Sequence, residues 1–425
     1  MLWNFTRKRD VGFAIIALLV LVGVAPQARA QTDVAFIPHT SPYPLYLNPE
    51  ARRYNIKWGN LEARFITSAQ VEFNDNIILS GTKPEGDISF GPDLQIGFQY
   101  PLSKRNTLEF NVGLGYRFYL EHPQLATFTV APNSKIYYEL LFDDVKLSVH
   151  DSFQVSVDPT GHPDISGSTT NAQAEISNFR RFDNSVGVQG DWKPYEDLTF
   201  SLNFDYAISR ALTDSFIGLD ADTYSWLASV SYKLSPRWIV GFQATYSWVD
   251  HLIAEQNNSA NLVAGPFFSY KPSQFITVSG SASFSFNTFD DHGTTADTSE
   301  FSSIVAQLAI DHRMNSHTTE SLHFSRSVGQ GFGHNYNDTY TGQYNINTKL
   351  TSHLTVSASA VYEMFKASGT LGESADRFLL YFGTGYQLDR HWHLGMAYAL
   401  ALKNSDQTAH NYKQNRLTLE LSRAY

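Results

Sequence analysis

The feature that most constrains this chain is a period-two alternation of apolar and polar residues, repeated in segment after segment. In one segment the apolar residues occupy every second position: Leu198, Phe200, Leu202, Phe204, Tyr206 and Ile208. Polar and small residues stand between them. Because successive side chains of a β-strand point to opposite faces, each such segment is predicted to be a strand with one apolar and one polar face. No helical pattern of useful length appears after the first 30 residues.

The connections between these strands alternate between two kinds. Eight are tight and lie at 101–106, 142–145, 193–196, 235–237, 271–273, 313–316, 351–352 and 388–390. Between them lie longer polar stretches, including 81–87, 158–173, 213–222, 290–299 and 404–411. Nine long loops and eight turns predict about 18 strands, within a range of 16–18. The weakest patterns lie at 125–140 and 328–344.

The alternation favours a barrel over a soluble sandwich. Aromatic residues make up 14% of the chain, yet the mean hydropathy is -0.26, so apolar residues are diluted by polar ones. A sandwich rarely joins this many long strands only as consecutive hairpins. Lipid cannot satisfy backbone polar groups, so a membrane-spanning sheet must close on itself. We therefore predict an all-β fold, a transmembrane antiparallel up-and-down β-barrel. An even strand count places the N- and C-termini together on the short-turn, periplasmic side.

The N-terminus has the pattern of a targeting segment. Arg7, Lys8 and Arg9 precede an apolar run at 11–24, and 28–30 reads Ala-Arg-Ala. This pattern predicts a signal peptide at 1–30, with an uncleaved anchor helix as the alternative. A proline-containing leader at 31–60 is predicted to lie in the periplasm before the barrel at 61–425. Export without any cysteine fits an envelope protein that uses no disulfides.

The chain ends inside an alternating strand, which is unusual because most chain ends are frayed and polar. We expect this strand to close the barrel by pairing with the first strand, near 65–73. The end also resembles the C-terminal signal that assembly machinery reads in outer-membrane proteins. Arg423 departs from that pattern, and the residues that match it are Leu417, Leu419, Leu421 and Tyr425.

Short motifs at both ends resemble one family. Phe73-Asn-Asp-Asn-Ile77 follows the first alternating strand, and Asn404-Ser-Asp406, Asn411-Tyr412 and Asn415-Arg-Leu417 lie near the end. They are similar to β-barrel porin-like proteins associated with exosortase and exopolysaccharide loci. That resemblance implies a porin-like role, with polysaccharide export as one suggestion.

The polar face of each strand is expected to line the interior. By alternation, the charged residues predicted to line this lumen are Glu72, Asp93, Glu109, Arg117, Lys146, Asp205, Glu363, Arg377 and Glu420. Barrels of this size leave an aqueous channel unless it is plugged. Acids outnumber bases in the set, which predicts a weakly cation-preferring, water-filled pore. The plainer alternative is that these groups pair with one another across the wall. The loop at 158–173 is a candidate to narrow the channel.

Nothing in the sequence points to catalysis, so we expect no enzyme activity, cofactor or metal. His391 and His393 share a strand face near a turn, but a solvated turn is the better interpretation. Asp220 and Asp222, and likewise 290–292, lie in long loops without a full calcium-binding pattern. No nucleophile elbow or zinc-protease motif is present.

The net charge of -10 argues against nucleic acid, which needs clustered basic residues. The leading hypothesis is a bacterial outer-membrane channel, either for passive diffusion or for export of polysaccharide or small solutes. The alternative is a non-conducting structural or adhesive barrel that binds partners through its long loops. Expected partners are outer-membrane lipid and lipopolysaccharide, the barrel-assembly machinery and periplasmic export components.

Overall fold

The computed structural model describes residues 56–103, 105–132, 134–156, 180–294, 297–370 and 372–425. The signal peptide, most of the leader and the loop at 158–173 lie outside the described residues. The first strands are β1 (Ile56–Trp58), β2 (Leu61–Asn74), β3 (Asp87–Ser103), β4 (Asn106–Tyr119), β5 (Thr127–Val130), β6 (Lys135–Leu141), β7 (Val145–Ser156), β8 (Arg181–Tyr195), β9 (Leu198–Ala211) and β10 (Ala221–Ser235). The others are β11 (Trp238–His251), β12 (Ser259–Tyr270), β13 (Ile276–Phe289), β14 (Phe301–Arg313), β15 (Thr318–Gln330), β16 (Tyr336–Lys349), β17 (Leu354–Ala367), β18 (Ser374–Gln387), β19 (Trp392–Ser405) and β20 (Tyr412–Ala424).

These strands form one closed antiparallel barrel with eighteen strand positions. β5 and β6 share one position, because both pair with β4 on one side and with β7 on the other. β1 is a short strand that pairs with the start of β2. The ring closes where β2 pairs with β20, from Ile66 opposite Ala424 to Asn74 opposite Arg416. The predicted barrel, its strand count and its closing pair are confirmed.

The two kinds of connection lie at opposite ends of the barrel. We call the end with the short connections the turn end and the other the loop end. Short connections join β3 to β4, β6 to β7, β8 to β9, β10 to β11, β12 to β13, β14 to β15, β16 to β17 and β18 to β19. Each falls at or beside a tight turn predicted from the sequence. The weak pattern at 125–140 corresponds to the broken strand formed by β5 and β6.

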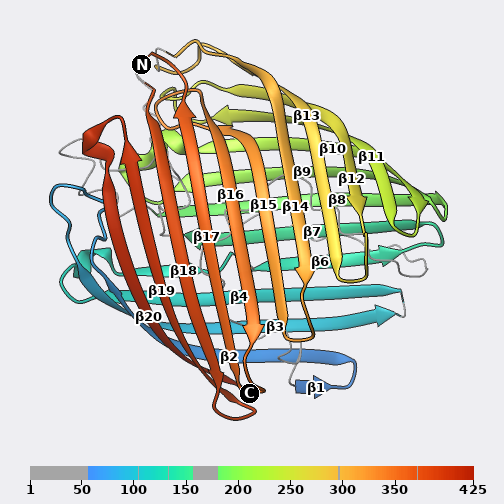
Figure 1. Ribbon diagram of the computed structural model, residues 1–425, viewed down its shortest axis with the longest axis horizontal. Helices are drawn as coiled ribbons and strands as arrows, with labels where there is room; N and C mark the ends of the chain where they lie inside the picture. Colours follow the sequence, from blue (N-terminus) through green and yellow to red (C-terminus); the bar gives the residue numbers. More distant parts are fainter. Residues whose placement is uncertain (1–55, 104, 133, 157–179, 295–296, 371) are drawn as a thin grey trace, which may run out of the picture.

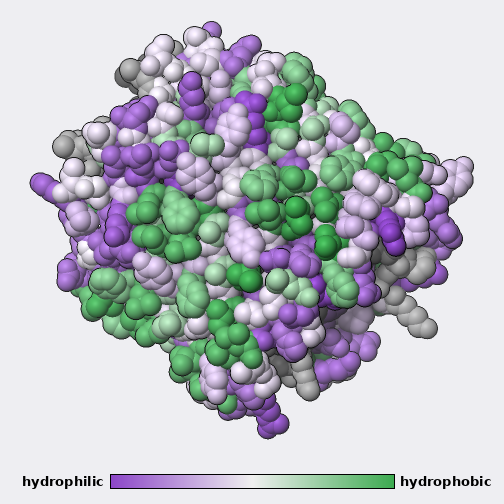
Figure 2. All heavy atoms as spheres, in the orientation of Figure 1, coloured by the Kyte–Doolittle hydropathy of each residue, from purple (hydrophilic) through white to green (hydrophobic). Residues whose placement is uncertain are grey.

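The outer face carries the apolar residues. Leu202 on β9, Leu308 on β14 and Leu394 on β19 are all exposed, which for a water-soluble protein would be costly along so many strands. Rings stack along the turn end, with Trp238 and Tyr270 only 4.1 Å apart between centroids. An apolar band flanked by aromatic rings matches a bilayer with its two interfaces. Figure 2 shows apolar residues gathered over the middle of one outer face.

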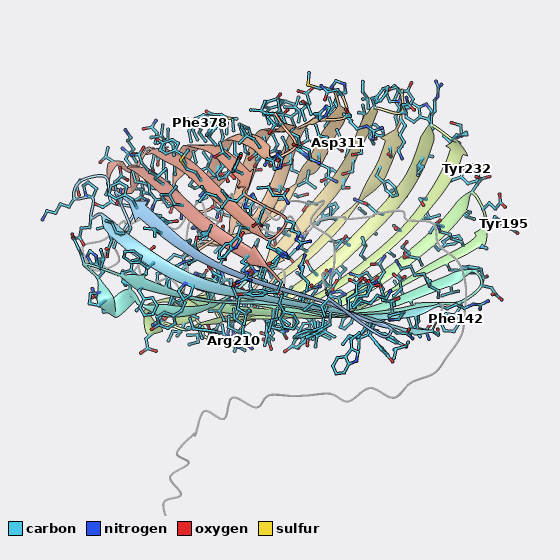
Figure 3. The ribbon with its side chains drawn as sticks, turned by 90° about the horizontal axis from the view of Figure 1, so that it is seen from below. Phe142, Tyr195, Arg210, Tyr232, Asp311 and Phe378 are labelled. Carbon is cyan, nitrogen blue, oxygen red and sulfur yellow. The ribbon has the colours of Figure 1, made fainter. Side chains whose placement is uncertain are left out.

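The barrel is flattened rather than round. In Figure 1 the wall formed by β16–β20 crosses in front of the wall that contains β3, β4 and β6–β8. Figure 3 shows Phe142, Tyr195 and Tyr232 together at the turn end, with Arg210 and Phe378 toward the other end on opposite walls. Within the described residues, no helix combines the length and apolarity needed to cross a bilayer.

Candidate channel interior

The strand register places the predicted lumen residues on the face opposite the exposed apolar side chains. Two pairs lie within the predicted set, at distances between charged atoms of 3.4 Å for Arg117–Asp93 and 2.6 Å for Arg377–Glu363. Lys146 lies 2.8 Å from Glu139. Asp205 lies 3.0 Å from the His150 ring. The interior is therefore lined with cross-strand ion pairs.

The other three members of the predicted set are acids. Glu72 accepts a hydrogen bond from Thr418 across the closing seam. Glu420 stands opposite Gln70, and Gln70 donates to Asp93, so Glu420 and Asp93 lie on one part of the wall. Glu109 stands in register with Gln99 of β3 and Tyr137 of β6.

The inner face carries more basic residues than the predicted set contains. Lys403 is an even number of positions from His393 along β19, and Arg416 is an even number of positions from Glu420 along β20. The period-two alternation therefore places Lys403 and Arg416 on the inner face, and it could have done so from the sequence. Arg64, Arg181, Lys233 and Arg313 follow by the same alternation. The same alternation also adds the acids Glu139, Asp183, Asp191 and Asp311 to the inner face, so the added basic residues do not by themselves remove the excess of acids.

A buried cluster lies at the loop end near β18 and β19. Lys403 is fully buried and lies 2.9 Å from the Glu373 carboxylate. His410 lies 2.9 Å from the other oxygen of the same carboxylate. Burial acts to raise the pKa of Glu373, but the hydrogen bond with His410 and the charge of Lys403 outweigh it and hold the pKa below its usual range. The cluster fixes the loop before β18 to the inner wall.

Two loops meet inside the barrel. Leu79 follows β2, and Phe216 belongs to a short 3-10 helix, η3 (Asp214–Leu219), between β9 and β10. Both are buried against Ala401 and Tyr412 of β19 and β20. β9 and β10 lie across the ring from β19 and β20, because the pairing order places roughly half of the strands between them in either direction. Phe216 therefore reaches the opposite wall and narrows the interior at the loop end.

Sequence reasoning did not single out Leu79 or Phe216. Their signal is an apolar run inside an otherwise polar loop, at 77–79 and at 216–219. Such runs are unusual in solvated loops and indicate burial. A third ring, Phe332 between β15 and β16, lies 6.2 Å from Phe216.

The motif behind the family resemblance builds the attachment of the first loop. The Asn76 side chain donates to the Ser80 and Lys413 carbonyls, both at 2.8 Å, and accepts from the Ser80 backbone N–H. The Asp75 carboxylate accepts from the backbone and the side chain of Asn415. This loop is thereby held against β20, and Leu79 is held at φ 49°, a conformation that residues other than glycine rarely adopt.

A second polar cluster joins four loops at the loop end. Asp297, between β13 and β14, accepts from the Asn335 backbone N–H at 2.8 Å and from the Ser368 hydroxyl. Asn257, between β11 and β12, donates to the Asp297 carbonyl and to the Asn335 side chain. Burial opposes ionisation, but the bonds from Ser299, Ser368 and Asn335 prevail and lower the pKa of Asp297. We call these residues the Asp297 knot.

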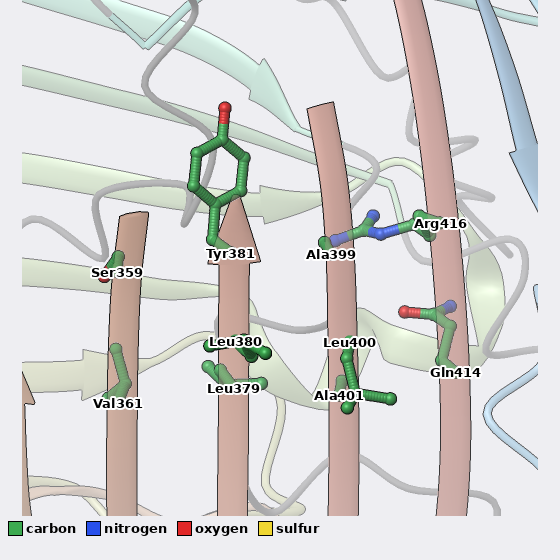
Figure 4. A pocket seen from close by; sticks show the side chains of 10 residues that line it. All are labelled: Ser359, Val361, Leu379, Leu380, Tyr381, Ala399, Leu400, Ala401, Gln414 and Arg416. Atoms are coloured by element: carbon green, nitrogen blue, oxygen red, sulfur yellow. The ribbon is translucent and has the colours of Figure 1, made fainter. Parts of the chain in front are cut away.

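A pocket lies on the inner side of β17–β20 beside the apolar contact of the two loops. Figure 4 shows Arg416 reaching from β20 toward Ala399, with Tyr381 on the far side of β19. Val361, Leu379 and Ala401 contribute an apolar surface to the same wall. This wall thus adds an apolar area to an interior that is polar along most strands.

The residues weighed for metal binding have structural contacts. His391 lies 3.1 Å from the Ala424 carbonyl, while His393 projects from β19 beside Gly385. Asp222 pairs with Arg210 on the outer face. Asp220 accepts from the Ala211 N–H, and Asp290 accepts from the Asn258 N–H. Over the described residues, no group of three or more His, Asp or Glu side chains is arranged to hold a metal ion.

The proposed assembly residues lie on the outer face of the last strand. Leu417, Leu419 and Leu421 are exposed there, and so is Tyr425. Tyr425 donates its backbone N–H to the Phe65 carbonyl and extends the seam by one residue. Its ring lies beneath the Arg423 guanidinium, 4.6 Å from the ring centroid.

A closed barrel with an apolar outer band and an ion-paired interior defines the class of membrane-spanning β-barrels of the bacterial outer membrane. No family model and no curated protein matches the chain. Similar solved structures include OccK5 (OpdH) of Pseudomonas aeruginosa, with 11% identity, 86% of this chain and 98% of that chain covered, and a TM-score of 0.48. OccAB3 of Acinetobacter baumannii has 12% identity, coverages of 85% and 99%, and a TM-score of 0.47. Likenesses this low assign no residue, solute or family to this chain.

Proposed function

We propose that this chain is an outer-membrane channel for passive diffusion of small polar solutes, with its turn end and both termini in the periplasm. The observation that carries the proposal is the inner face, where charged residues of β3, β4, β6, β7, β9, β17 and β18 pair with one another. An interior of eighteen strands is wide enough to hold water. Water-lined ion pairs favour passage of polar solutes over apolar ones.

The narrowed loop end sets the size of solute. Phe216 and Leu79 meet at the wall formed by β19 and β20. A solute that crosses the loop end must therefore pass beside this contact. This favours small solutes over a polymer. The polysaccharide export that the family resemblance suggests would need the contact to open, and we therefore rank it second.

The test is single-channel conductance of the refolded mature protein in a planar bilayer. We expect discrete steps, and larger steps for Phe216→Ala, because the ring that reaches the opposite wall is removed. Leu252→Ala is the matched control, since Leu252 lies in another connection at the same end and is exposed. Its steps should equal those of the parent protein.

A correctly folded barrel that stays silent would overturn the channel proposal. A non-conducting structural or adhesive barrel would then remain, and protease trimming of the long loops would test it through loss of binding. Unchanged steps for Phe216→Ala would contradict only the constriction. In the membrane, we propose contacts with lipid and lipopolysaccharide along the outer band, and with the assembly machinery through β20.

A further inference from the structure

Five consecutive hairpins place a basic residue at the same structural position. Each stands at the turn end of an even-numbered strand and donates its backbone N–H to a carbonyl of the neighbouring turn. The donors and acceptors are Lys193 to Asp144, Lys233 to Asp197, Lys271 to Arg237, Arg313 to Phe275 and Lys349 to His317, at 2.7–2.9 Å. The shared hydrogen bond shows that the five are equivalent around the ring.

The orientation of the preceding residue shows which face of the barrel wall each basic side chain is on. Trp192 and Tyr232 are exposed on the outer face, and Tyr270 stacks on Trp238 at the same level. Since side chains alternate along a strand, Lys193, Lys233 and Lys271 fall on the inner side. Together with Arg313, Lys349 and Arg237, they form what we call the basic rim of the turn-end mouth.

Three members of the basic rim line one hollow. Lys233, Arg237 and Lys271 surround it, together with Ser235, Ile239 and Ser269. Ile239 stands in register with both Lys233 and Ser269, so the hollow spans three adjacent strands. It opens on the inner side of the mouth and offers three cationic groups and two hydroxyls.

The positive charge of this hollow is only weakly neutralised by acidic side chains. Lys233 lies 3.9 Å from Asp197, and both side chains are about half exposed, so the pair contributes little. Among the residues that the structure describes, no ion pair forms at Arg237 or Lys271. Asp311 shares the inner face of β14 with Arg313, but the inner positions of β12 and β13 carry uncharged residues such as Ser269, Ser279 and Ser281.

We propose that the basic rim binds the carboxylate or phosphate groups of anionic solutes at the turn-end mouth, and that it gives this mouth a preference for anions. The inference rests on the proposed channel function and adds a solute class to it. Clustered charge of one sign raises the local concentration of the opposite ion and speeds its entry. The rim thus reverses the cation preference predicted from the acid-rich lumen set.

The experiment compares two double variants that each remove two positive charges. Lys233→Gln with Lys271→Gln neutralises the hollow. Lys83→Gln with Lys413→Gln neutralises two exposed lysines at the loop end. In a salt gradient across a planar bilayer, the first variant should lower the anion-to-cation permeability ratio by at least about twofold. It should also raise the citrate concentration needed for half-block, while the control matches the parent.

The outcomes separate this proposal from the channel itself. If the parent conducts and the hollow variant keeps the same permeability ratio and citrate block, the basic rim is not an anion site. If the parent is silent, calorimetric titration of citrate into detergent-solubilised protein decides. Binding to the parent and the control, but not to the hollow variant, supports the site, and equal binding or none overturns it.

Discussion

Asn76 shows how one side chain fixes a loop to the barrel. It is buried, and its amide makes three hydrogen bonds within the first loop and to β20. Asn76→Ala would leave the Lys413 and Ser80 carbonyls without these donors. We expect the free energy of unfolding to fall by about 2 kcal/mol. Urea unfolding in lipid vesicles measures this, with Asn60→Ala in the exposed turn between β1 and β2 as the control.

Asp297 gives the loop end a dependence on pH. Its folded pKa lies below the usual carboxyl value of 3.8. The bonds of the Asp297 knot are therefore at full strength above about pH 4 and weaken as the pH falls through the lowered pKa. Hydrogen exchange of the four loops, corrected for intrinsic rates, should rise over that acidic range. Asp297→Asn cannot ionise, so its loops should exchange faster at pH 7 and show no such rise.

At the scale of elements, the strands could be predicted and the loop contacts could not. Alternation depends on residues next to one another, so the segment 198–208 was sufficient to predict β9. The contact of Phe216 with Ala401 joins segments far apart in sequence, and only the closed ring brings them together. The basic rim was missed for a similar reason. Lys233 and Lys271 look like ordinary turn lysines until the register shows that they share one mouth.

The last strand permits a prediction that separates assembly from stability. Tyr425 and Tyr386 are equally exposed on the outer face at the turn end, each at 46%. Each Tyr→Ala variant should refold in vitro almost as well as the parent, because a single rim ring contributes about 1 kcal/mol or less. In cells, only Tyr425→Ala should reduce the heat-modifiable, folded form severalfold. Equal yields for the two variants would mean that Tyr425 is no assembly signal.

At the scale of the whole molecule, two faces of one sheet meet different solvents. The outer band meets lipid, which cannot solvate charge, and the interior is proposed to meet water. Leu308 and Ala309 are neighbours near the middle of β14, and the register places them on opposite faces. Leu308 is exposed on the outer face. Ala309 shares the inner face with Asp311.

An arginine at each of these two positions tests both solvents at once. Leu308→Arg places a charge in the apolar band and should lower the free energy of unfolding by about 2–4 kcal/mol. Ala309→Arg places the same charge inside, within reach of Asp311, and should change stability by less than about 1 kcal/mol. Tryptophan fluorescence during urea unfolding in vesicles measures both. Similar losses for the two variants would mean that the interior is as poor a solvent for charge as the lipid, and a water-filled channel could not then be sustained.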